Sequence, residues 1–336
     1  MHRDTIEEIV KETKYCLTES LGEGGFSCVY LVTDKHIGKE YALKVVEAKE
    51  EYKDSEIKLL KNLKHEGLPD LHDVFMHKDY TCIVMEYIKG ESLEQYVAKK
   101  GKLLPKEAMN LGKQLSEILC YLHSRNVPVI HGDLKPQNIM IQEGRVRLID
   151  FGSAFRQYDK KEHVYGTKGY ASPEQYQNEL FTQSDIYSFG MVMLYMLTGR
   201  QAYLFVNEIT INELKRYGIP FRLRRIIMQC LSFEVNERFS GGKELKDALK
   251  KVKGMTRQLP GQCIAWISTL IRLFGMLSLL QGLFLWKQQY MQDIRCLFIG
   301  SVCVIILSYI TESFSYKAYK TAILECECSL FVSEGL

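Results

Sequence analysis

Strand-like patterns dominate the first quarter of the chain. Residues 28–32 and 41–46 alternate or run apolar, which is typical of half-buried and buried strands. Residues 81–87 form another apolar run of strand length. Residues 54–63 instead carry their apolar side chains at helical spacing, so one face of a helix is expected to pack inward. The pattern predicts strands with one helix among them.

From residue 92 onward the apolar spacing is mainly helical. Helices are predicted over residues 92–100, 105–124, 182–197, 221–230 and 240–252. Pro105 suits a first helical turn, where its missing N–H costs no hydrogen bond, and Ser240 is expected to cap the last helix. Short strands around a loop are predicted at 129–130 and 138–149. A β-rich part is therefore followed by a mainly helical part.

The composition is that of an ordinary folded protein, with 25% charged residues and a net charge of +3 over 336 residues. This balance does not indicate nucleic-acid binding. The ten Cys residues show no zinc-ligand spacing, and Cys326 and Cys328 are the one close pair, so reduced thiols are expected. Residues 1–14 are polar and lack the apolar core of a signal peptide, so the first domain is expected in the cytosol.

A glycine-rich segment, residues 22–27 (GEGGFS), lies between two strand-like runs. Glycines let backbone N–H groups come close to phosphate oxygens. An ordinary glycine turn has the same composition, so this segment alone decides nothing.

Lys44 lies inside an otherwise apolar strand. Burial of an ammonium costs free energy unless it is paired, and either phosphates or a carboxylate could pair with it. Glu56 is the preferred carboxylate because it shares a helix with Ile57 and Leu60, whose face would pack inward. The rival carboxylates are Glu47, Glu50 and Glu51.

A polar loop, residues 131–138 (HGDLKPQN), precedes Asp150, which begins an Asp-Phe-Gly motif. The carboxylate of Asp133 could orient a hydroxyl nucleophile and accept its proton. Asn138 and Asp150 could supply the oxygen ligands that Mg²⁺ prefers, and Lys135 could reach a γ-phosphate. Polar residues also cap turns. Turn capping alone, however, would not explain why the glycine-rich segment, the strand lysine, the polar loop and the Asp-Phe-Gly motif follow one another at compatible spacing. The set therefore predicts phosphoryl transfer.

In this order, the glycine loop, strand lysine, helix glutamate, polar loop and Asp-Phe-Gly motif resemble the eukaryotic-type (Hanks-type) protein kinase family. Residues 166–174 (GTKGYASPE) resemble the end of that family's activation segment, and residues 185–190 (DIYSFG) resemble its central C-lobe helix. Arg238 resembles the late arginine that pairs with the segment's glutamate, here Glu174. The resemblance covers residues 10–252 and implies an α+β fold of two lobes, a β-rich N-lobe and a helical C-lobe.

The resemblance implies that ATP lies between the lobes, with Mg²⁺ or alternatively Mn²⁺ beside it. It places the nucleotide at Leu21, Gly22, Gly24, Gly25, Val29, Ala42, Lys44, Met85, Glu86, Ile88 and Met140. The catalytic residues that it implies are Asp133, Lys135, Lys44 and Glu56, and the metal ligands are Asn138 and Asp150. It also stacks four residues between the lobes, namely Leu60, Leu71, His131 and Phe151.

Two features of the resemblance indicate serine and threonine as acceptors. Lys135 follows Asp133 in a D-L-K-P pattern, and Thr167 matches a threonine that the family places near this aspartate. One departure concerns regulation. Gly132 stands where many members have an arginine that holds a phosphorylated activation segment. Activity is therefore predicted to depend weakly on phosphorylation of that segment.

The chain becomes strongly apolar after residue 262. Residues 263–286 hold one charge, Arg272, and residues 295–311 hold none after Arg295. A bilayer-spanning helix needs about 20 residues, so a transmembrane helical hairpin is predicted. An arginine at mid-span costs about 2.5–3.5 kcal/mol, which the surrounding apolar residues can offset. One span with an interfacial helix, and a soluble tail, remain as alternatives.

The predicted order is a basic juxtamembrane linker at 253–262, the spans at 263–286 and 295–311, and a short cytoplasmic tail at 312–336. The basic residues before the first span are Lys250, Lys251, Lys253 and Arg257. They outnumber those in the connector 287–294, which predicts a cytoplasmic kinase domain at the cell membrane. This organisation resembles membrane-anchored bacterial kinases.

Together these features predict a membrane-tethered serine/threonine kinase that acts on proteins and not on nucleic acid. A homodimer that phosphorylates itself is a further expectation. Two alternatives are a catalytically weak pseudokinase or scaffold, and a small-molecule kinase. Both are less favoured because the catalytic residues are all present and residues 166–174 would form a peptide-docking platform.

Overall fold

The computed structural model describes residues 3–23, 27–47, 53–157, 166–201 and 210–252, together with Leu273, Met276 and Leu277. The chain divides into two units, Met1–Met255 and Thr256–Leu336, and the fold described below belongs to the first. Apart from those three residues, the predicted spans at 263–286 and 295–311 lie outside the described part of the chain. Within that part, no helix is both long and apolar enough to cross a membrane.

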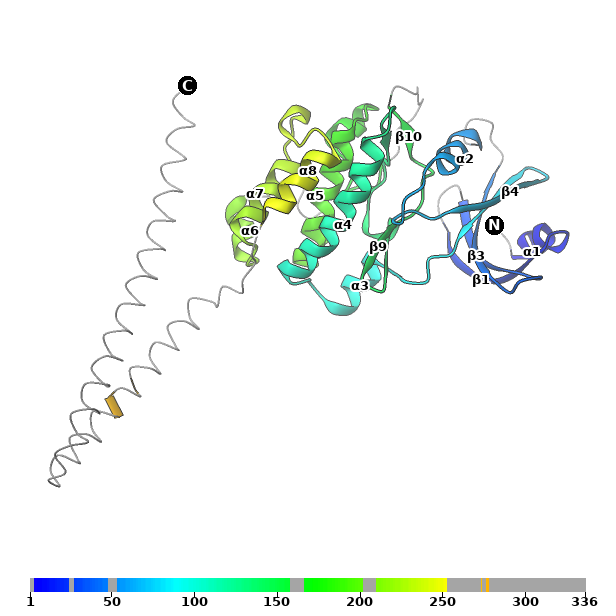
Figure 1. Ribbon diagram of the computed structural model, residues 1–336, viewed down its shortest axis with the longest axis horizontal. Coiled ribbons are helices and arrows are strands. Elements are labelled where there is room, and N and C mark those ends of the chain that lie inside the picture. Colours follow the sequence, from blue (N-terminus) through cyan, green and yellow to red (C-terminus); the bar gives the residue numbers. More distant parts are fainter. Residues whose placement is uncertain are drawn as a thin grey trace. The chain divides into compact units, whose positions relative to one another are not determined.

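The N-lobe is a five-stranded antiparallel sheet of order β1-β2-β3-β5-β4 with one helix on each face (Figure 1). Its elements are α1 (Arg3–Lys11), β1 (Tyr15–Glu23), β2 (Ser27–Asp34), β3 (Glu40–Glu47), α2 (Lys53–Asn62), β4 (Leu71–His77) and β5 (Tyr80–Glu86). Strand β3 shows how the two faces differ. Tyr41 and Leu43 join the buried cluster beneath α1, whereas Ala42 joins a cluster that includes Ile57 of α2. Because side chains alternate along a strand, Lys44 shares the α2 face with Ala42.

Helix α1 is an element that the sequence did not predict. Its apolar residues Ile6 and Ile9 are fully buried against the sheet, and Lys78 forms a 2.7 Å ion pair with Glu8. A nine-residue helix is marginal by itself, so α1 depends on this packing for its stability. The many charged residues around its few apolar ones hid the pattern.

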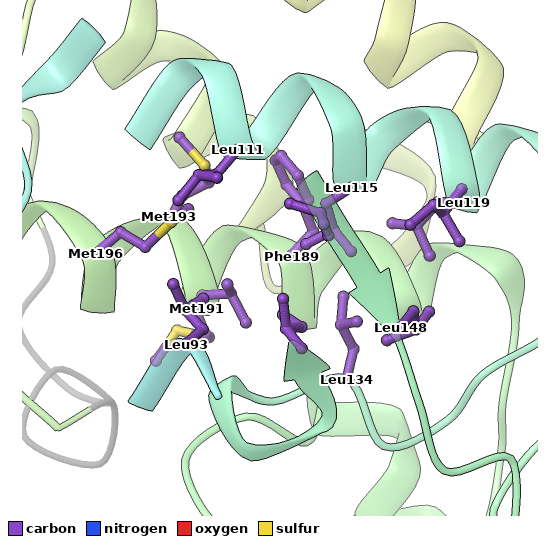
Figure 2. Close-up of a cluster of buried hydrophobic side chains, with 14 of the residues drawn as sticks. Leu93, Leu111, Leu115, Leu119, Leu134, Leu148, Phe189, Met191, Met193 and Met196 are labelled. Atoms are coloured by element: carbon purple, nitrogen blue, oxygen red, sulfur yellow. The ribbon is translucent and has the colours of Figure 1, made fainter. Parts of the chain in front are cut away.

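The C-lobe is mainly helical, as predicted. Its helices are α3 (Leu93–Lys100), α4 (Pro105–His123), α5 (Thr182–Thr198), α6 (Ile211–Arg216), α7 (Phe221–Cys230) and α8 (Gly242–Lys251). Helix α5 is central, with 15 of its 17 residues buried. Leu111 and Leu115 of α4 lie beside Met193 and Phe189 of α5, respectively, in the main hydrophobic core (Figure 2). The short helix α6 was not predicted.

Short strands carry the loops of the site. They are β6 (Glu91–Ser92), β7 (Val129–Ile130), β8 (Ile139–Gln142), β9 (Arg145–Leu148) and β10 (Phe155–Arg156). Strand β8 pairs with both β6 and β9, and β7 pairs with β10. The predicted polar loop runs from β7 to β8 and includes a single 3-10 turn at Pro136–Asn138. It is therefore fixed at both ends by strand pairing.

The expected cap of the last helix was wrong. Helix α8 begins at Gly242, its N-cap is Gly241, and no side chain caps it. Ser240 instead donates from its amide and its hydroxyl to the carboxylate of Glu244, at 2.9 and 3.0 Å. The start of α8 packs closely on α4, because a Cβ at Gly242 would lie 2.3 Å from the carbonyl carbon of Leu119 and from the amide nitrogen of Cys120.

Candidate active site

Lys44, Glu56 and Asp150 meet in one cluster, in which Lys44 and Glu56 are buried and the side chain of Asp150 is 44% exposed. The ammonium of Lys44 lies 2.8 and 2.9 Å from the two carboxylate oxygens of Glu56, and 2.8 Å from Oδ1 of Asp150. Lys44 and Glu56 are 5% and 6% exposed, so the pair is shielded from solvent. Helix α2 thus brings Glu56 to the lysine, while Glu50 and Glu51 lie outside the described residues and Glu47 ends β3.

The cluster fixes the charges of its members. Burial lowers the pKa of Lys44, but the carboxylates of Glu56 and Asp150 outweigh it, so the net shift is upward. For Asp150, burial raises the pKa, but the ammonium of Lys44 and the amide of Gly152 lower it to about 2. Lys44 is therefore an ammonium and Asp150 a carboxylate throughout the physiological pH range.

The backbone at Asp150 holds the Asp-Phe-Gly motif in an unusual conformation. Asp150 adopts φ of 62°, a left-handed value that is uncommon outside glycine and that clusters at functional sites. The next residue, Phe151, is 1% exposed, and its ring centroid lies 5.1 Å from that of His131. Leu60 shares their buried core and Leu71 packs against it. The four residues of the predicted stack therefore lie in one core.

Asp133, Lys135 and Thr167 form a triangle of polar contacts. The hydroxyl of Thr167 donates to Oδ1 of Asp133 at 2.7 Å, and the ammonium of Lys135 lies 2.7 Å from Oδ2. Lys135 also donates to the Thr167 hydroxyl at 2.9 Å. Asn138 donates from Nδ2 to the backbone carbonyl of Asp133 at 2.8 Å. A threonine from the later segment thus helps to orient the carboxylate of the polar loop.

Asp185 holds the start of the polar loop and had no role in the sequence analysis. Its carboxylate accepts from the amides of His131 and Gly132, at 2.8 and 2.9 Å. His123 accepts at Nδ1 from the amide of Gly242, so its Nε2 carries the hydrogen and donates to Asp185 at 3.0 Å. Burial raises the pKa of Asp185, but the hydrogen bonds from His123 and Gly132 and the charges of the two nearby histidines together outweigh it, so the net shift is downward. The available signal was that Asp185 is the one charged residue in helix α5.

Gly132 has little room for a side chain. Its φ is 76°, and a Cβ there would lie 3.1 Å from the carbonyl oxygen of Ser153 and 3.2 Å from a methyl group of Leu180. Its own carbonyl accepts from Nε2 of Gln175 at 2.9 Å. Glycine relieves both the backbone strain and the crowding at this position.

The predicted nucleotide residues that the structure describes come from both lobes. Ala42 and Met85 form a small buried cluster with Ile83, against which Val29 packs. Met140 lies on β8 of the other lobe, paired with Ser92 of β6. Leu21 and Gly22 are exposed residues of β1, Ile88 is buried, and Gly24 and Gly25 lie outside the described residues. The carboxylate of Glu86 is bound by Arg147 of β9, whose guanidinium also donates to the carbonyl of Leu68 at 2.9 Å.

A family model, the protein kinase domain, matches residues 15–257. The chain belongs to the protein kinase family. It is similar to a probable serine/threonine-protein kinase of Clostridium acetobutylicum, with 28% identity over 73% of this chain and 40% of that protein. It is also 28% identical to serine/threonine-protein kinase PrkC of Bacillus subtilis, over 70% of this chain and 40% of PrkC. CBL-interacting protein kinase 21 of Oryza sativa subsp. japonica is 33% identical over 60% of this chain and 41% of that protein.

The similarity covers only part of the length of these kinases. The chain covers about two fifths of the length of the relatives that it matches. The family match and the two observed lobes confirm the predicted kinase fold.

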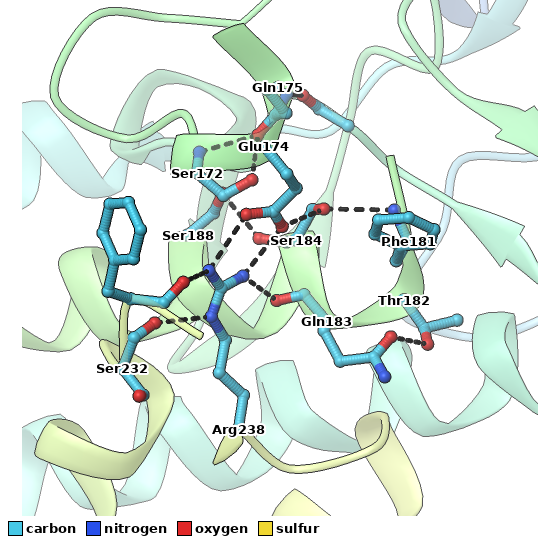
Figure 3. A network of polar contacts seen from close by, with 12 residues as sticks. Ser172, Glu174, Gln175, Phe181, Thr182, Gln183, Ser184, Ser188, Ser232 and Arg238 are labelled. Atoms are coloured by element: carbon cyan, nitrogen blue, oxygen red, sulfur yellow. Dashed lines mark hydrogen bonds and ion pairs between the residues drawn. The ribbon is translucent and has the colours of Figure 1, made fainter. Parts of the chain in front are cut away.

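The kinase domain also contains a buried ion pair between Arg238 and Glu174 (Figure 3). Arg238 donates through Nη1 and Nη2 to the two oxygens of Glu174, at 2.8 and 2.9 Å, and Ser184 donates to the same carboxylate at 2.6 Å. The guanidinium also donates to three backbone carbonyls, those of Ser232, Phe233 and Gln183. This arrangement ties the end of the activation segment to the C-lobe.

The residues present fit ATP and a divalent cation. Asn138 uses its amide nitrogen on Asp133, which leaves the amide oxygen as a donor for a metal, and Asp150 uses one of its oxygens on Lys44. A carboxylate and an amide oxygen are hard ligands of the kind that Mg²⁺ takes. Among the described residues, no group of three or more His, Cys, Asp and Glu side chains is placed to hold a metal. Mg²⁺ in nucleotide sites is generally held by one or two protein oxygen ligands together with substrate phosphates.

Proposed function

We propose that this kinase transfers the γ-phosphate of ATP to serine and threonine hydroxyls of proteins. The observation that carries the proposal is the triangle of Asp133, Lys135 and Thr167, with contacts of 2.7 to 2.9 Å. It provides a carboxylate to orient an acceptor hydroxyl and a cation beside it. The names of the bacterial relatives, which are serine/threonine-protein kinases, support the same acceptor.

Each residue then has a stated task. Asp133 accepts the proton of the acceptor hydroxyl, and Lys135 stabilises negative charge on the phosphoryl group in transfer. Lys44 binds phosphate oxygens while Glu56 holds its ammonium in place. Asn138 and Asp150 would hold Mg²⁺, for which Mn²⁺ is the alternative. The metal would supply positive charge that offsets the negative charge of the phosphates.

The adenine would lie between the lobes. Val29 and Ala42 cover it from the N-lobe and Met140 from the C-lobe, with Met85 at the back and the backbone of residues 86–88 at its edge. Leu21, Gly22, Gly24 and Gly25 would cover the nucleotide from β1 and the turn that follows it.

A radiolabelled ATP assay with a generic protein substrate tests this function. We expect Asp133→Ala to lower phosphate incorporation by at least about 100-fold, because general-base catalysis typically contributes that much. The label should appear on serine and threonine after acid hydrolysis. Equal incorporation by the wild type and the variant would refute the proposed mechanism, and label on tyrosine alone would refute the acceptor class.

We also propose that the kinase depends weakly on phosphorylation of its activation segment. Gly132 supplies no guanidinium for a phosphate, and the geometry at this position disfavours any side chain. The hydroxyls to test are Ser153, Tyr158, Tyr165 and Tyr170, of which Tyr158 and Tyr165 lie outside the described residues. Removal of each in turn is expected to change activity by less than about tenfold. A larger loss that an acidic replacement restores would contradict this.

The location of the kinase is a further proposal. Residues 263–286 and 295–311 would anchor it as a helical hairpin in the cell membrane, with the kinase domain and residues 312–336 in the cytoplasm. The linker 253–262 would join domain and anchor, and self-phosphorylation within a homodimer would be possible there. An alkaline carbonate wash of cell membranes is expected to leave the chain in the pellet. Release into the supernatant would show that it does not span the bilayer.

A further inference from the structure

Helices α6 and α7, at one end of the C-lobe, present a charged surface that the catalytic site does not use (Figure 1). Residues 210–230 contain five basic side chains and one acidic side chain, Glu213. Four of the basic side chains and two large apolar ones are exposed: Ile211, Lys215, Arg216, Phe221, Arg222 and Arg225. We call these six residues the basic patch.

The basic patch draws its residues from two helices that contact each other. Helix α7 buries Leu223 and its apolar neighbours, which leaves Arg222 and Arg225 about one turn apart on the solvent side. The fifth basic residue, Arg224, joins the helices. Its Nη1 donates to the carbonyl of Ile211 at 3.1 Å, and its guanidinium lies 5.5 Å from the centroid of the Phe221 ring. Ile211 and Phe221 therefore flank one arginine.

The charges of the basic patch are not neutralised locally. In the part of the chain that the structure describes, no ion pair involves Lys215, Arg216, Arg222 or Arg225. The six residues thus combine a net positive field with apolar side chains that are 39% exposed at Ile211 and 45% exposed at Phe221. Basic and aromatic or aliphatic side chains exposed together are typical of surfaces that lie in the headgroup region of anionic membranes.

The residues that follow α7 are also rich in positive charge. Helix α8 contacts α7 and ends in the exposed residues Lys250 and Lys251. Lys253 and Arg257 then precede the apolar residues 263–286. Positive charge is therefore concentrated in the helices nearest in sequence to the proposed anchor.

We propose that the basic patch binds the anionic headgroups of the membrane that holds the kinase, with Ile211 and Phe221 entering the headgroup boundary. This rests on the proposed membrane anchor for its location. The patch holds no residue of the catalytic cluster, so it would orient the domain and leave phosphoryl transfer to a soluble peptide unchanged.

Hydrogen–deuterium exchange on the full chain in vesicles tests the basic patch. One vesicle preparation is phosphatidylcholine, and the other also contains phosphatidylglycerol. Exchange of the amides in residues 211–229 is expected to slow by at least about tenfold on the anionic vesicles relative to the neutral ones. About 0.5 M NaCl should abolish the difference, because salt screens the attraction.

Two charge-reversal variants separate the patch from the general charge of the protein. The first is Lys215→Glu, Arg216→Glu, Arg222→Glu and Arg225→Glu together. The matched control reverses four exposed lysines elsewhere, with Lys11→Glu, Lys39→Glu, Lys61→Glu and Lys106→Glu. The first variant should lose the lipid-dependent protection and keep the peptide kinase activity, and the control should keep both.

Failure of the proposed membrane anchor can be distinguished from failure of the basic-patch proposal. If a carbonate wash releases the chain, the anchor fails, and co-sedimentation of the released chain with the same vesicles still tests the patch. Equal protection on neutral and anionic vesicles, or protection that survives the fourfold reversal of the patch, would overturn the proposal. Protection that appears without lipid as the protein concentration rises would also overturn it, because the patch would then join copies of the chain.

Discussion

Replacement of Lys44 by methionine is expected to lower kcat by about 100- to 1000-fold, because it removes a preorganised charge that acts on the transferring phosphoryl group. The same change leaves the carboxylates of Glu56 and Asp150 together without the cation that now lies 2.8 Å from each. Methionine matches the length and the apolar stem of lysine, so the packing against β2 and β5 should survive. Single-turnover kinetics with labelled ATP measures the effect.

A second variant in the same cluster serves as a control. Glu56→Gln keeps a hydrogen-bond partner for Lys44 but removes its charge, so a loss of about tenfold is expected. Activity of Lys44→Met close to that of the wild type would show that the ammonium does not act on the phosphates. Activity of Glu56→Gln as low as that of Lys44→Met would show that the glutamate does more than hold the lysine.

The Lys44 variant also has an expected pH signature. In the wild type the pKa of Asp150 is lowered from 3.8 to about 2, so the folded state gains stability from this group above pH 3.8 and loses it as the pH falls toward 2. Without the ammonium, the lowering should be lost, and the pKa of Asp150 should return toward its ordinary value. The part of the acid-induced loss of stability that this group causes should therefore be smaller in Lys44→Met.

Replacement of Arg238 by leucine is expected to destabilise the kinase domain by about 3–5 kcal/mol, because it leaves the carboxylate of Glu174 buried without its cation. Arg238 is 4% exposed, and three backbone carbonyls also lose their donor. Urea unfolding followed by circular dichroism measures the free energy. Leucine supplies apolar volume, so the loss would come from unpaired polar groups and not from a cavity.

A surface pair of the same length is the matched control. Lys64 and Asp70 also lie 2.8 Å apart, but their side chains are 66% and 70% exposed. Lys64→Ala is expected to cost less than about 1 kcal/mol, since solvent screens exposed pairs. Equal costs for the two substitutions would contradict the role of burial. In the double variant Glu174→Leu with Arg238→Leu, the cost should fall below the sum of the two single changes.

The order of the chemical groups along the chain was predictable, because phosphoryl transfer needs a small set of side-chain types at defined places. Glu56 could be preferred over the other candidate glutamates because it lies on a helix whose apolar face packs against the sheet. That packing brings the Glu56 carboxylate toward the buried strand that carries Lys44. The structure brings Lys44 and Glu56 together as that argument expected. Local sequence therefore carried much of the site.

Contacts between distant segments were harder to predict. Asp185 accepts hydrogen bonds from backbone amides more than 50 residues earlier in the sequence. No rule of residue spacing predicts that these two segments meet. The start of α8 depends on the close approach of Gly242 to α4, which overrode the capping preference of Ser240. Helix α6 was missed because it is only six residues long.

The position of helix α1 has a consequence for how the protein is cut and expressed. The family match starts at residue 15, whereas the helix that seals one face of the N-lobe sheet begins at Arg3. A chain that began at residue 15 would lack α1 and would expose Tyr15, Tyr30 and Tyr41 to solvent on one face of the sheet. An exposed apolar face of this kind favours self-association. The family match thus begins after α1, whereas the part of the chain that folds together begins before it.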